Sequence, residues 1–418
     1  MADGDKNTKV SHAKRGAIVF FTVVAALVCV LVLLILRLTG CMGGGAAPSP
    51  TPSPSPTPAP SATATPAPTA FTPRTATIRA VGDLMMHAEQ LEAAHLGGEA
   101  YDFSRQYAMI ADSLSAADYT IANLETTVGL YSDKPYSGYP LFNAPPELLD
   151  AICEAGIDFV SLANNHILDR YYDGMVITVG NVAYSGLDYG GVNLSQEQKD
   201  TANIVEVNGI KLGMLCYTQM TNGMEVHCDE RATQFGVNYV NNCDFATDVQ
   251  RAREAGADVV IAFMHWGKEY VRSSNGAQQR LANRLIEVGV DVIIGSHPHV
   301  VQPAGMREGA LEDGTPREVL LAYSLGNFNS GMIVEYTDSG IILEFTIVER
   351  EDGGFDIVDI GFVPTYCWNR NGSFETVRAL DYYDQRPEGM TAEQHQRLRK
   401  SVDDVQALMG GRLEMLSR

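Results

Sequence analysis

The sequence predicts an α/β fold in which much of the sheet is parallel. Short apolar segments with strand composition alternate with segments of helical periodicity, which is typical of βαβ units. One strand, at residues 290–294, is nearly continuous in β-branched residues, as expected for a strand buried on both faces. After residue 299 strands follow one another without helices, so we expect the sheet content to be divided between two layers.

The composition indicates a folded, acidic protein. The chain has 418 residues, of which 45% are hydrophobic, enough for one large domain or two modest ones. The net charge of −21, without a cluster of Lys and Arg, argues against a nucleic-acid partner held by phosphate contacts. This acidic balance fits an exported domain.

The N-terminal region has the features of a membrane anchor. Residues 17–36 carry no charge and are long enough to cross a bilayer as a helix. Four basic residues lie in the preceding stub, residues 1–16, so the positive-inside rule places the stub in the cytoplasm and the rest outside a bacterial cell membrane. The alternative is a lipoprotein, because residues 38–41 resemble a lipidation signal ending at Cys41. The length of the apolar run and Arg37 favour the uncleaved anchor.

Residues 37–74 are expected to form a linker. Most of this segment is Pro, Ser, Thr and Ala, with proline at every second position from Pro48 to Pro60. Its residues 46–73 cannot bury a core and favour polyproline II structure, which at ~3.1 Å per residue would reach roughly 90 Å from the membrane.

The folded domain is predicted at residues 75–370, followed by a helical extension at 371–418. Strands are expected at residues 77–81, 119–122, 159–162, 258–264 and 290–294, and later at 318–323, 340–348 and 355–363. Helices are expected from about residue 88 and at residues 146–155, 244–255 and 277–288. A hairpin at 203–207 and 211–215 is indicated by Asn208-Gly209.

The extension begins with a capping box, Thr391 with Gln394, and apolar residues at helical spacing follow it, namely Leu398, Val402, Val405 and Leu408. We expect a terminal helix docked on the domain, without a role in chemistry.

The cysteines do not form a recognisable framework. Five of the seven fall in the folded part without close spacing, so free thiols are expected. A bridge between Cys228 and Cys243 is the alternative.

Polar side chains follow five of the predicted strands. They are Asp83 and His87 after the first, Asn123 and Glu125 after the second, Asn164, Asn165, His166 and Asp169 after the third, His265 and Glu269 after the fourth, and His297 and His299 after the fifth. The carboxyl ends of neighbouring parallel strands meet along one sheet edge, so we expect these groups to converge there. Gly295 would let the backbone turn before His297, and Pro298 would stiffen the link to His299.

This set of donors predicts a metal site. Imidazole together with carboxylate and amide oxygen suits Zn, Mn or Fe rather than calcium. A carboxylate that bridges two such ions is typical of sites that activate water and hold a phosphoryl group. Each residue alone also has an ordinary interpretation, such as Asp83 and Asn165 as turn residues or helix caps and His265 as a core histidine. The coincidence at five strand ends favours the metal site.

The ordered series of motifs resembles a known family. It comprises Gly-Asp83-x-x-x-His87, Asn123-Leu-Glu125, Asn164-Asn165-His166-x-x-Asp169, His265-Trp-Gly-x-Glu269, His297-Pro-His299-Val-x-Gln302 and Ser324-Leu-Gly-Asn327-Phe328. From about residue 77 to 328 the chain is similar to the CapA family of poly-γ-glutamate capsule synthesis proteins, in the calcineurin-like metallophosphoesterase superfamily. The resemblance implies a two-sheet β-sandwich flanked by helices, with an αββα arrangement and a dinuclear metal site.

The resemblance also implies roles for individual residues. One ion would be held by Asp83, His87 and His299, the other by Asn165, His265 and His297, with Glu125 bridging. His166 would be the general acid or transition-state donor, and we place Asp169 beside it in the catalytic set. Asp169 and Glu269 have no counterpart in the superfamily and are expected to hydrogen-bond ligand imidazoles. The remaining positions expected to support ligands or contact substrate are Asn123, Asn164, Gln302, Ser324 and Asn327.

The chain departs from the superfamily pattern at two points. Three residues separate Asp83 from His87, where the superfamily usually has one. Glu125 stands where the superfamily has an Asp.

The resulting hypothesis is a membrane-tethered, extracytoplasmic, metal-dependent phosphoesterase-type hydrolase. It would use two divalent transition-metal ions (Mn, Zn or Fe) and act in the synthesis or export of an anionic capsule or surface polymer such as poly-γ-glutamate. Its substrate would be that polymer or a phosphoester, and polymer synthase subunits are candidate partners. The first alternative is a non-catalytic accessory subunit of a membrane polymer synthase, in which any metal is structural.

A serine hydrolase is a minor alternative. Residues 321–326, Leu-Ala-Tyr-Ser324-Leu-Gly, approximate a nucleophile elbow. In that fold the histidine follows the serine, and here only His395, in the predicted terminal helix, does so.

Overall fold

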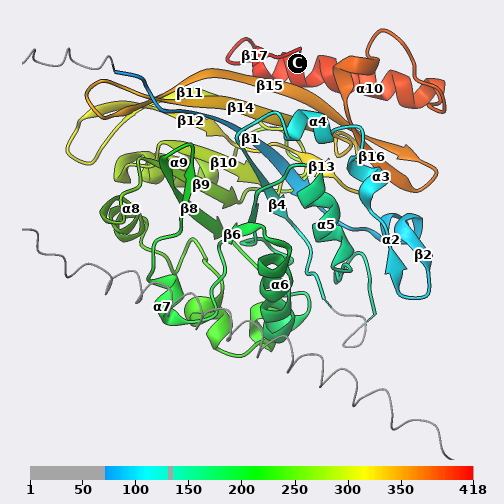
Figure 1. The fold of residues 1–418 in the computed structure, drawn as a ribbon, viewed down its shortest axis with the longest axis horizontal. Helices are drawn as coiled ribbons and strands as arrows, with labels where there is room; N and C mark the ends of the chain where they lie inside the picture. The colour runs from blue at the N-terminus through cyan, green and yellow to red at the C-terminus, as the bar shows by residue number, and fades with distance from the viewer. Residues whose placement is uncertain (1–70, 130–134, 418) are drawn as a thin grey trace, which may run out of the picture. The chain divides into compact units, whose positions relative to one another are not determined.

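Two β-sheets pack face to face in the computed structural model, which describes residues 71–129 and 135–417 (Figure 1). One sheet runs in the order β16 (Ser373–Arg378), β15 (Phe355–Arg370), β14 (Ser339–Glu349), β1 (Thr75–Leu84), β4 (Tyr119–Leu124), β5 (Phe159–Ser161), β6 (Asp188–Gly190), with β13 (Asn327–Asn329) paired to β1 and β17 (Glu414–Met415) to β15. The other runs β11 (Ala304–Ala310), β12 (Pro316–Ala322), β10 (Val292–Ser296), β9 (Val259–His265), β8 (Ile210–Thr218), β7 (Ile204–Val207). A small hairpin joins β2 (His95–Gly97) to β3 (Ala100–Tyr101).

Each sheet has a parallel part that carries strand ends to the same place. In the first sheet β1, β4, β5 and β6 are parallel, and in the second β8, β9, β10 and β12 are parallel. The hairpin strand β7 and the strand β11 are antiparallel to their neighbours at the two edges of the second sheet. The expected α/β fold with a parallel sheet is therefore confirmed, and the division into two layers is observed.

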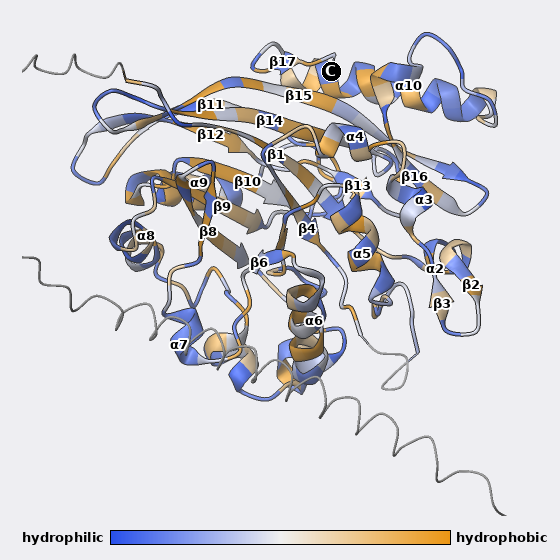
Figure 2. Ribbon diagram, viewed as in Figure 1, coloured by the Kyte–Doolittle hydropathy of each residue, from blue (hydrophilic) through white to orange (hydrophobic). Residues whose placement is uncertain are grey.

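The core lies between the sheets and under the helices that cover their outer faces. Ile78, Phe263 and Ile294 belong to one buried cluster between the two sheets. Figure 2 shows apolar residues concentrated in the strands of both layers. The helices are α2 (Ala88–Ala94), α3 (Ser104–Tyr107), α4 (Ala111–Leu114), α5 (Glu147–Glu154), α6 (Tyr171–Ser185), α7 (Gln196–Lys199), α8 (Phe245–Glu254), α9 (Gly276–Val288) and α10 (Ala392–Met409). Helices α5 and α6 cover the first sheet, and α8 and α9 cover the second.

Capping residues fix several helix ends where the sequence indicates them. Asp244 accepts a hydrogen bond from the backbone of Ala246 at the start of α8, and Thr391 with Gln394 forms the expected capping box of α10. Helix α10 docks through Leu398 and Val402, which lie in a buried cluster with residues of β15 and β16. The predicted terminal helix is confirmed, and residues 371–418 also contribute the strands β16 and β17.

Several predictions concern the N-terminal region or the cysteines. The predicted stub (1–16), the anchor (17–36) and nearly all of the linker (37–74) lie outside the described residues. Among the residues that are described, no helix has both the length and the apolar character needed to span a membrane. The cysteines of the described part, including Cys228 and Cys243, are free thiols, as expected.

One local expectation was wrong. Gly295 does not turn the chain but lies within β10, where a Cβ atom would come 2.1 Å from the carbonyl oxygen of Tyr323. Glycine is required there because another backbone approaches closely. The turn follows instead at His297 and His299, whose φ angles are 92° and 57°. Non-glycine residues seldom adopt these angles, and such strain is concentrated at functional sites.

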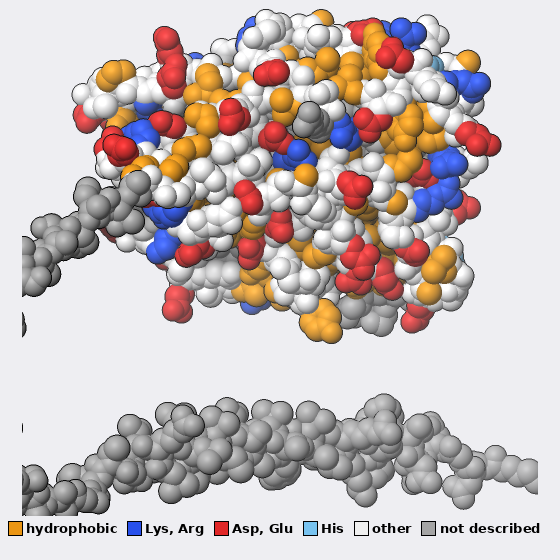
Figure 3. Space-filling model, turned by 45° about the horizontal axis from the view of Figure 1, so that its top comes forward, with side chains coloured by type: hydrophobic (Ala, Val, Ile, Leu, Met, Phe, Trp, Pro, Cys, Tyr) orange, Lys and Arg blue, Asp and Glu red, His pale blue; other side chains and the backbone are white. Residues whose placement is uncertain are grey.

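The surface is acidic in character. Figure 3 shows Asp and Glu side chains spread over one face, with Lys and Arg side chains among them. This agrees with the net charge of −21.

Candidate metal centre

The polar residues that follow the five predicted strands converge, but not along one sheet edge as expected. Strands β1, β4 and β5 belong to the first sheet, and β9 and β10 belong to the second. Their carboxyl ends therefore meet where the two sheets face each other. The sandwich arrangement brings the two sets of ends together, and a single-sheet interpretation could not have shown this.

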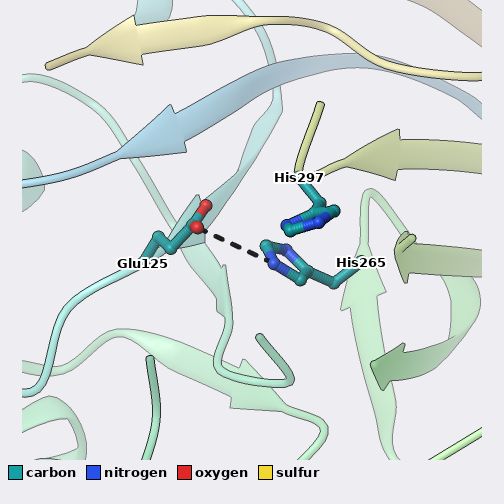
Figure 4. A group of neighbouring side chains, drawn as sticks. All are labelled: Glu125, His265 and His297. Atoms are coloured by element: carbon teal, nitrogen blue, oxygen red, sulfur yellow. Dashed lines mark ion pairs between the residues drawn. The ribbon is translucent and has the colours of Figure 1, made fainter. Parts of the chain in front are cut away.

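Three groups of side chains have the geometry to hold a cation. The groups are Glu125 with His265 and His297, Asp83 with Glu125 and His299, and Glu269 with His297 and His299. Within each group the ligand atoms lie within 4.8 Å of one another. Figure 4 shows the first group, with Glu125 reaching from the end of β4 toward the imidazoles at the ends of β9 and β10. Five of the seven predicted metal ligands thus belong to these groups.

Glu125 belongs to two of the three groups. Its Oε1 lies 3.7 Å from Nε2 of His265 and 3.7 Å from Nε2 of His299. This oxygen is buried and has no hydrogen-bond partner among the described residues. Burial, followed by the charge of Asp83, raises the pKa of Glu125 well above its usual value. A cation at this point would reverse that effect and satisfy the oxygen, so the donor set fits divalent metal ions.

The histidines are held in the form that binds metals. Burial, followed by the neighbouring imidazoles of His297 and His299, lowers the pKa of His265 well below its usual value. Burial and then His299 lower the pKa of His297 to about 3. Both imidazoles are therefore neutral at physiological pH, and each can offer a nitrogen lone pair.

Hydrogen bonds orient the imidazoles. Nδ1 of His265 lies 3.0 Å from the hydroxyl of Ser296, and its Nε2 lies 3.0 Å from Oδ1 of Asn165. This places Asn165, predicted as a ligand, beside His265. Nδ1 of His299 lies 3.1 Å from Oδ2 of Asp83 and 3.0 Å from Oδ1 of Asn327. Because these oxygens are acceptors, Nδ1 of His299 carries the proton and Nε2 is left to face Glu125.

Asn123 and Asn164 hold the carboxylates in place. The Asn123 amide donates to Oδ1 of Asp83 at 2.8 Å and to Oε2 of Glu125 at 3.0 Å. Asn164 in turn donates to Oδ1 of Asn123 at 3.3 Å and to the carbonyl of Leu124 at 2.7 Å. These contacts are consistent with the predicted supporting roles of the two asparagines.

His166 and Asp169 form a buried pair. Nδ1 of His166 lies 2.8 Å from Oδ2 of Asp169, which also accepts the backbone N–H of Phe142 at 2.8 Å. The ring of Phe142 packs edge-on against His166, with centroids 4.7 Å apart. Burial raises the pKa of Asp169, and the bond to His166 acts in the opposite direction. Asp169 is thus placed to orient the imidazole it bonds.

His87 lies close by but in none of the three groups. Its Nδ1 accepts the backbone N–H of Gly331 at 3.2 Å, and its ring packs edge-on against Phe142 at 5.3 Å. Burial is the main cause that lowers its pKa to about 4. The ligand role of His87 stays a prediction, and the longer spacing from Asp83 is the sequence feature that sets it apart.

Two other residues predicted to support the site, Gln302 and Ser324, have different hydrogen-bond partners. Gln302 donates to the carbonyls of Val271 and Ser273 at 2.7 and 3.2 Å. It thereby holds the loop that carries Glu269. Ser324 is buried, and its hydroxyl accepts the backbone N–H of Gly326 at 3.2 Å, whereas His395 bonds the carbonyl of Tyr382. Ser324 and His395 thus have separate partners, which disfavours the serine hydrolase.

Sequence reasoning missed three contributors. Ser296 bonds His265, and Phe142 contacts Asp169 and His166. Tyr270 contacts the turn from His297 to His299 through its backbone N–H and its ring. Ser296 directly precedes His297, so it could have been predicted from the motif that contains His297 and His299. Phe142 has no local signal, because it belongs to a loop far from any predicted strand end.

A separate large cavity has a different lining. It measures about 800 Å³ and is bordered by Tyr189, Asn203, Lys199, Asp248 and Arg251, among others. None of the predicted site residues lines it.

Comparison with known proteins places these residues in a family context. Residues 77–332 match the family described as bacterial capsule synthesis protein PGA_cap. The chain is 28% identical over 289 residues to "Capsule biosynthesis protein CapA" of Bacillus anthracis, which covers 68% of this chain and 66% of that protein. The chain thus spans just under two thirds of that relative. It is 26% identical over 282 residues to "PGA biosynthesis protein CapA" of Bacillus subtilis, covering 67% and 70% of the two chains.

More distant similarities were also found. A "Probable polyglutamine synthesis accessory protein" of Mycobacterium tuberculosis is 26% identical over 207 residues, covering 47% of this chain and 53% of that one. Among solved structures, the NAD nucleotidase of Haemophilus influenzae aligns with a TM-score of 0.41 and 11% identity, over 83% of this chain and 65% of that one.

Proposed function

Because the chain belongs to the bacterial capsule synthesis protein family PGA_cap, we propose that it acts in the synthesis or export of an anionic surface polymer such as poly-γ-glutamate. Within this role we propose that it is a metal-dependent phosphoesterase-type hydrolase, tethered to the outer side of the bacterial membrane by residues 17–36. The names of the two Bacillus relatives, both described as biosynthesis proteins, support this role. The proposed hydrolysis is supported by the geometry of the candidate metal centre.

The observation that carries the proposal is the position of Glu125. Its buried, unpartnered Oε1 lies 3.7 Å from two imidazole nitrogens that follow different strands, as a carboxylate shared between two ions would. Asp83 and His299 would complete one ion's ligands, and Asn165, His265 and His297 the other's. Bound Mn, Zn or Fe ions would lower the pKa of a water molecule and hold the oxygens of a phosphoryl group.

The chain's own groups provide the proton transfer. Asp169 accepts from Nδ1 of His166 and fixes the ring orientation, so Nε2 is the nitrogen that exchanges a proton with the leaving group. Phe142 packs on the same ring and limits its rotation. His166 would therefore act as the general acid, and Asp169 would position it.

The full-length chain in detergent provides the test. After purification, its Mn, Zn and Fe content is measured, and hydrolysis of bis(p-nitrophenyl) phosphate and p-nitrophenyl phosphate is assayed with Mn²⁺ or Zn²⁺. We expect bound metal and turnover, both lost in His265→Ala and retained in His227→Ala, which alters an exposed histidine outside the centre. Absence of turnover, or equal turnover in the two variants, would reject the hydrolase.

A second candidate is a non-catalytic accessory subunit of a membrane polymer synthase. The mycobacterial relative, which is described as a probable accessory protein, favours this role. Complementation separates the two roles. In a strain that lacks the gene, a folded His166→Ala variant that retains metal would restore polymer production only if the role is accessory.

A further inference from the structure

The loop after β9 brings a third carboxylate to the metal centre. Glu269 is half-buried, and its carboxylate lies within 4.8 Å of ligand nitrogens of both His297 and His299. From the sequence this residue was expected to hydrogen-bond a ligand imidazole. No hydrogen bond or ion pair, however, joins Glu269 to either histidine in the described structure. The spacing leaves room for an ion, because each ligand of a zinc ion lies ~2.0–2.2 Å from it.

The loop is fixed on both sides of Glu269. The backbone N–H of Tyr270 donates to the carbonyl of Pro298 at 2.8 Å, directly between the two histidines. Further along the loop, the Gln302 amide holds Val271 and Ser273, and before Glu269 the backbone N–H of Gly267 donates to Oε1 of Gln219 at 2.9 Å. Tyr270 adopts a φ angle of 63°, which is uncommon for a residue with a side chain. The carboxylate is thus preorganised beside the histidines.

A nitrogen of His297 has no hydrogen-bond partner. Nδ1 of His297 is buried and has no hydrogen-bond partner among the described residues, and the His297 side chain is only 4% exposed. A buried polar atom without a partner is costly, so native structures seldom keep one unless a water or an ion satisfies it. This observation is independent of the position of Glu269.

The negative charges of three carboxylates near His299 also favour a bound cation. Asp83, Glu125 and Glu269 each lie within 4.8 Å of a ligand nitrogen of His299. Three carboxylates therefore share one neighbourhood, and their repulsion is relieved either by protonation or by bound cations.

We propose that Glu269 is itself a ligand of the metal centre, beside His297 and His299. This inference rests on the metal-dependent character of the proposed function but not on hydrolysis. It adds a carboxylate to the predicted ligand set, and it assigns Gln302 the role of positioning the loop that bears it.

The test measures metal binding without any substrate. Full-length wild-type protein, Glu269→Gln and Glu269→Ala are stripped with chelator and titrated with Zn²⁺ and Mn²⁺ in competition with an indicator. The matched control is Glu318→Gln, the same chemical change at an exposed residue of β12. The absorption spectrum of bound Co²⁺ reports the ligand set directly, and circular dichroism verifies folding of each variant.

We expect both Glu269 variants to bind metal at least roughly tenfold more weakly, the lower limit of what loss of even an outer partner costs. Their Co²⁺ spectra should change, whereas Glu318→Gln should match the wild type. Unchanged affinity would overturn the proposal, as would weaker affinity with an unchanged Co²⁺ spectrum, which indicates positioning rather than ligation. A wild-type protein that binds no metal would overturn it together with the proposed function. A wild type that binds metal but hydrolyses nothing would reject only the hydrolase.

Discussion

Oε1 of Glu125 lies 3.7 Å from Nε2 of His299, although the first residue follows β4 of one sheet and the second follows β10 of the other. The same oxygen lies equally close to Nε2 of His265, which ends β9. A cation bound at this point would therefore link the two layers of the sandwich. Metal binding and folding should be coupled in this protein.

The first prediction follows from that coupling. Binding of metal to the folded state alone raises stability by about 2.7 kcal/mol when free metal is 100 times its dissociation constant. We expect the thermal midpoint of chelator-treated protein to rise when Zn²⁺ or Mn²⁺ is added, as measured by differential scanning calorimetry. The rise should be absent in His265→Ala and present in His227→Ala. An equal rise in both variants would show that the ions bind elsewhere.

Glu125→Gln should have opposite effects on the metal-free and metal-loaded protein. The raised pKa of Glu125 means that its charged form is unfavourable in the folded metal-free state. Removing the charge should therefore stabilise that state by about 1–3 kcal/mol, which urea denaturation in chelator can measure. The same variant should lose most of its metal affinity. A variant that is destabilised without metal would contradict this account.

Acid should destabilise the metal-free protein through His297. Burial and His299 lower its pKa to about 3 from an ordinary value of 6.5, so the unfolded chain takes up a proton that the folded chain does not. The stability that neutral His297 contributes is complete above about pH 6.5 and is lost as the pH falls below it, by about 1.4 kcal/mol per unit. Glu125 has the opposite effect on the free energy of unfolding. Because its pKa is raised in the folded state, its contribution to stability increases as the pH falls.

A difference measurement isolates the histidine. Urea denaturation in chelator at about pH 7.5 and about pH 5.5 should show a smaller acid-induced loss for His297→Asn than for the wild type, by about 1.4 kcal/mol. Equal losses in the two proteins would show that His297 does not titrate in this way.

His166→Ala should separate catalysis from metal binding. The imidazole bonds Asp169 rather than a residue of the three metal-binding groups, so its removal should leave metal content unchanged. If His166 is the general acid, turnover of a phosphodiester should fall by roughly 10²–10⁴-fold. Asp169→Asn should cause a smaller loss, because it disturbs orientation only. Loss of metal in His166→Ala would instead make it a ligand or a folding determinant.

Local sequence patterns were sufficient to predict where the strands end. They were not sufficient to predict which strand ends lie together in the folded protein. The β-branched run that becomes β10 and the capping box at Thr391 each depend on neighbouring residues, and both were recognisable. The convergence of Glu125 with His265 depends on the packing of two sheets, which no local pattern encodes. The distinction between Glu269 as a hydrogen-bond partner and as a ligand depends on a gap of a few ångströms.

Helix α6 shows a second limit. Gly174 and Gly180 each cost about 1 kcal/mol relative to alanine in a helix, and the β-branched residues between them add to the cost, so the segment was not predicted as helical. Packing overrides this propensity. Val179 and Val182 lie in the buried cluster on the outer face of the first sheet, and Thr178 bonds the carbonyl of Gly174.

The last prediction concerns substrate charge and rests on Glu269 as a ligand. With Asp83, Glu125 and Glu269 around two divalent ions, the centre carries one positive charge fewer than a site with two carboxylates. Its attraction for a doubly charged phosphomonoester should therefore exceed that for a singly charged phosphodiester by less than in such a site, because attraction scales with the product of the charges. Glu269→Gln restores the missing charge and should raise the ratio of monoester to diester turnover, measured as kcat/KM at saturating metal. Glu318→Gln should leave the ratio unchanged, since its carboxylate is solvent-exposed and screened. A ratio that is the same in wild type and Glu269→Gln would show that the carboxylate does not set the charge that the substrate meets.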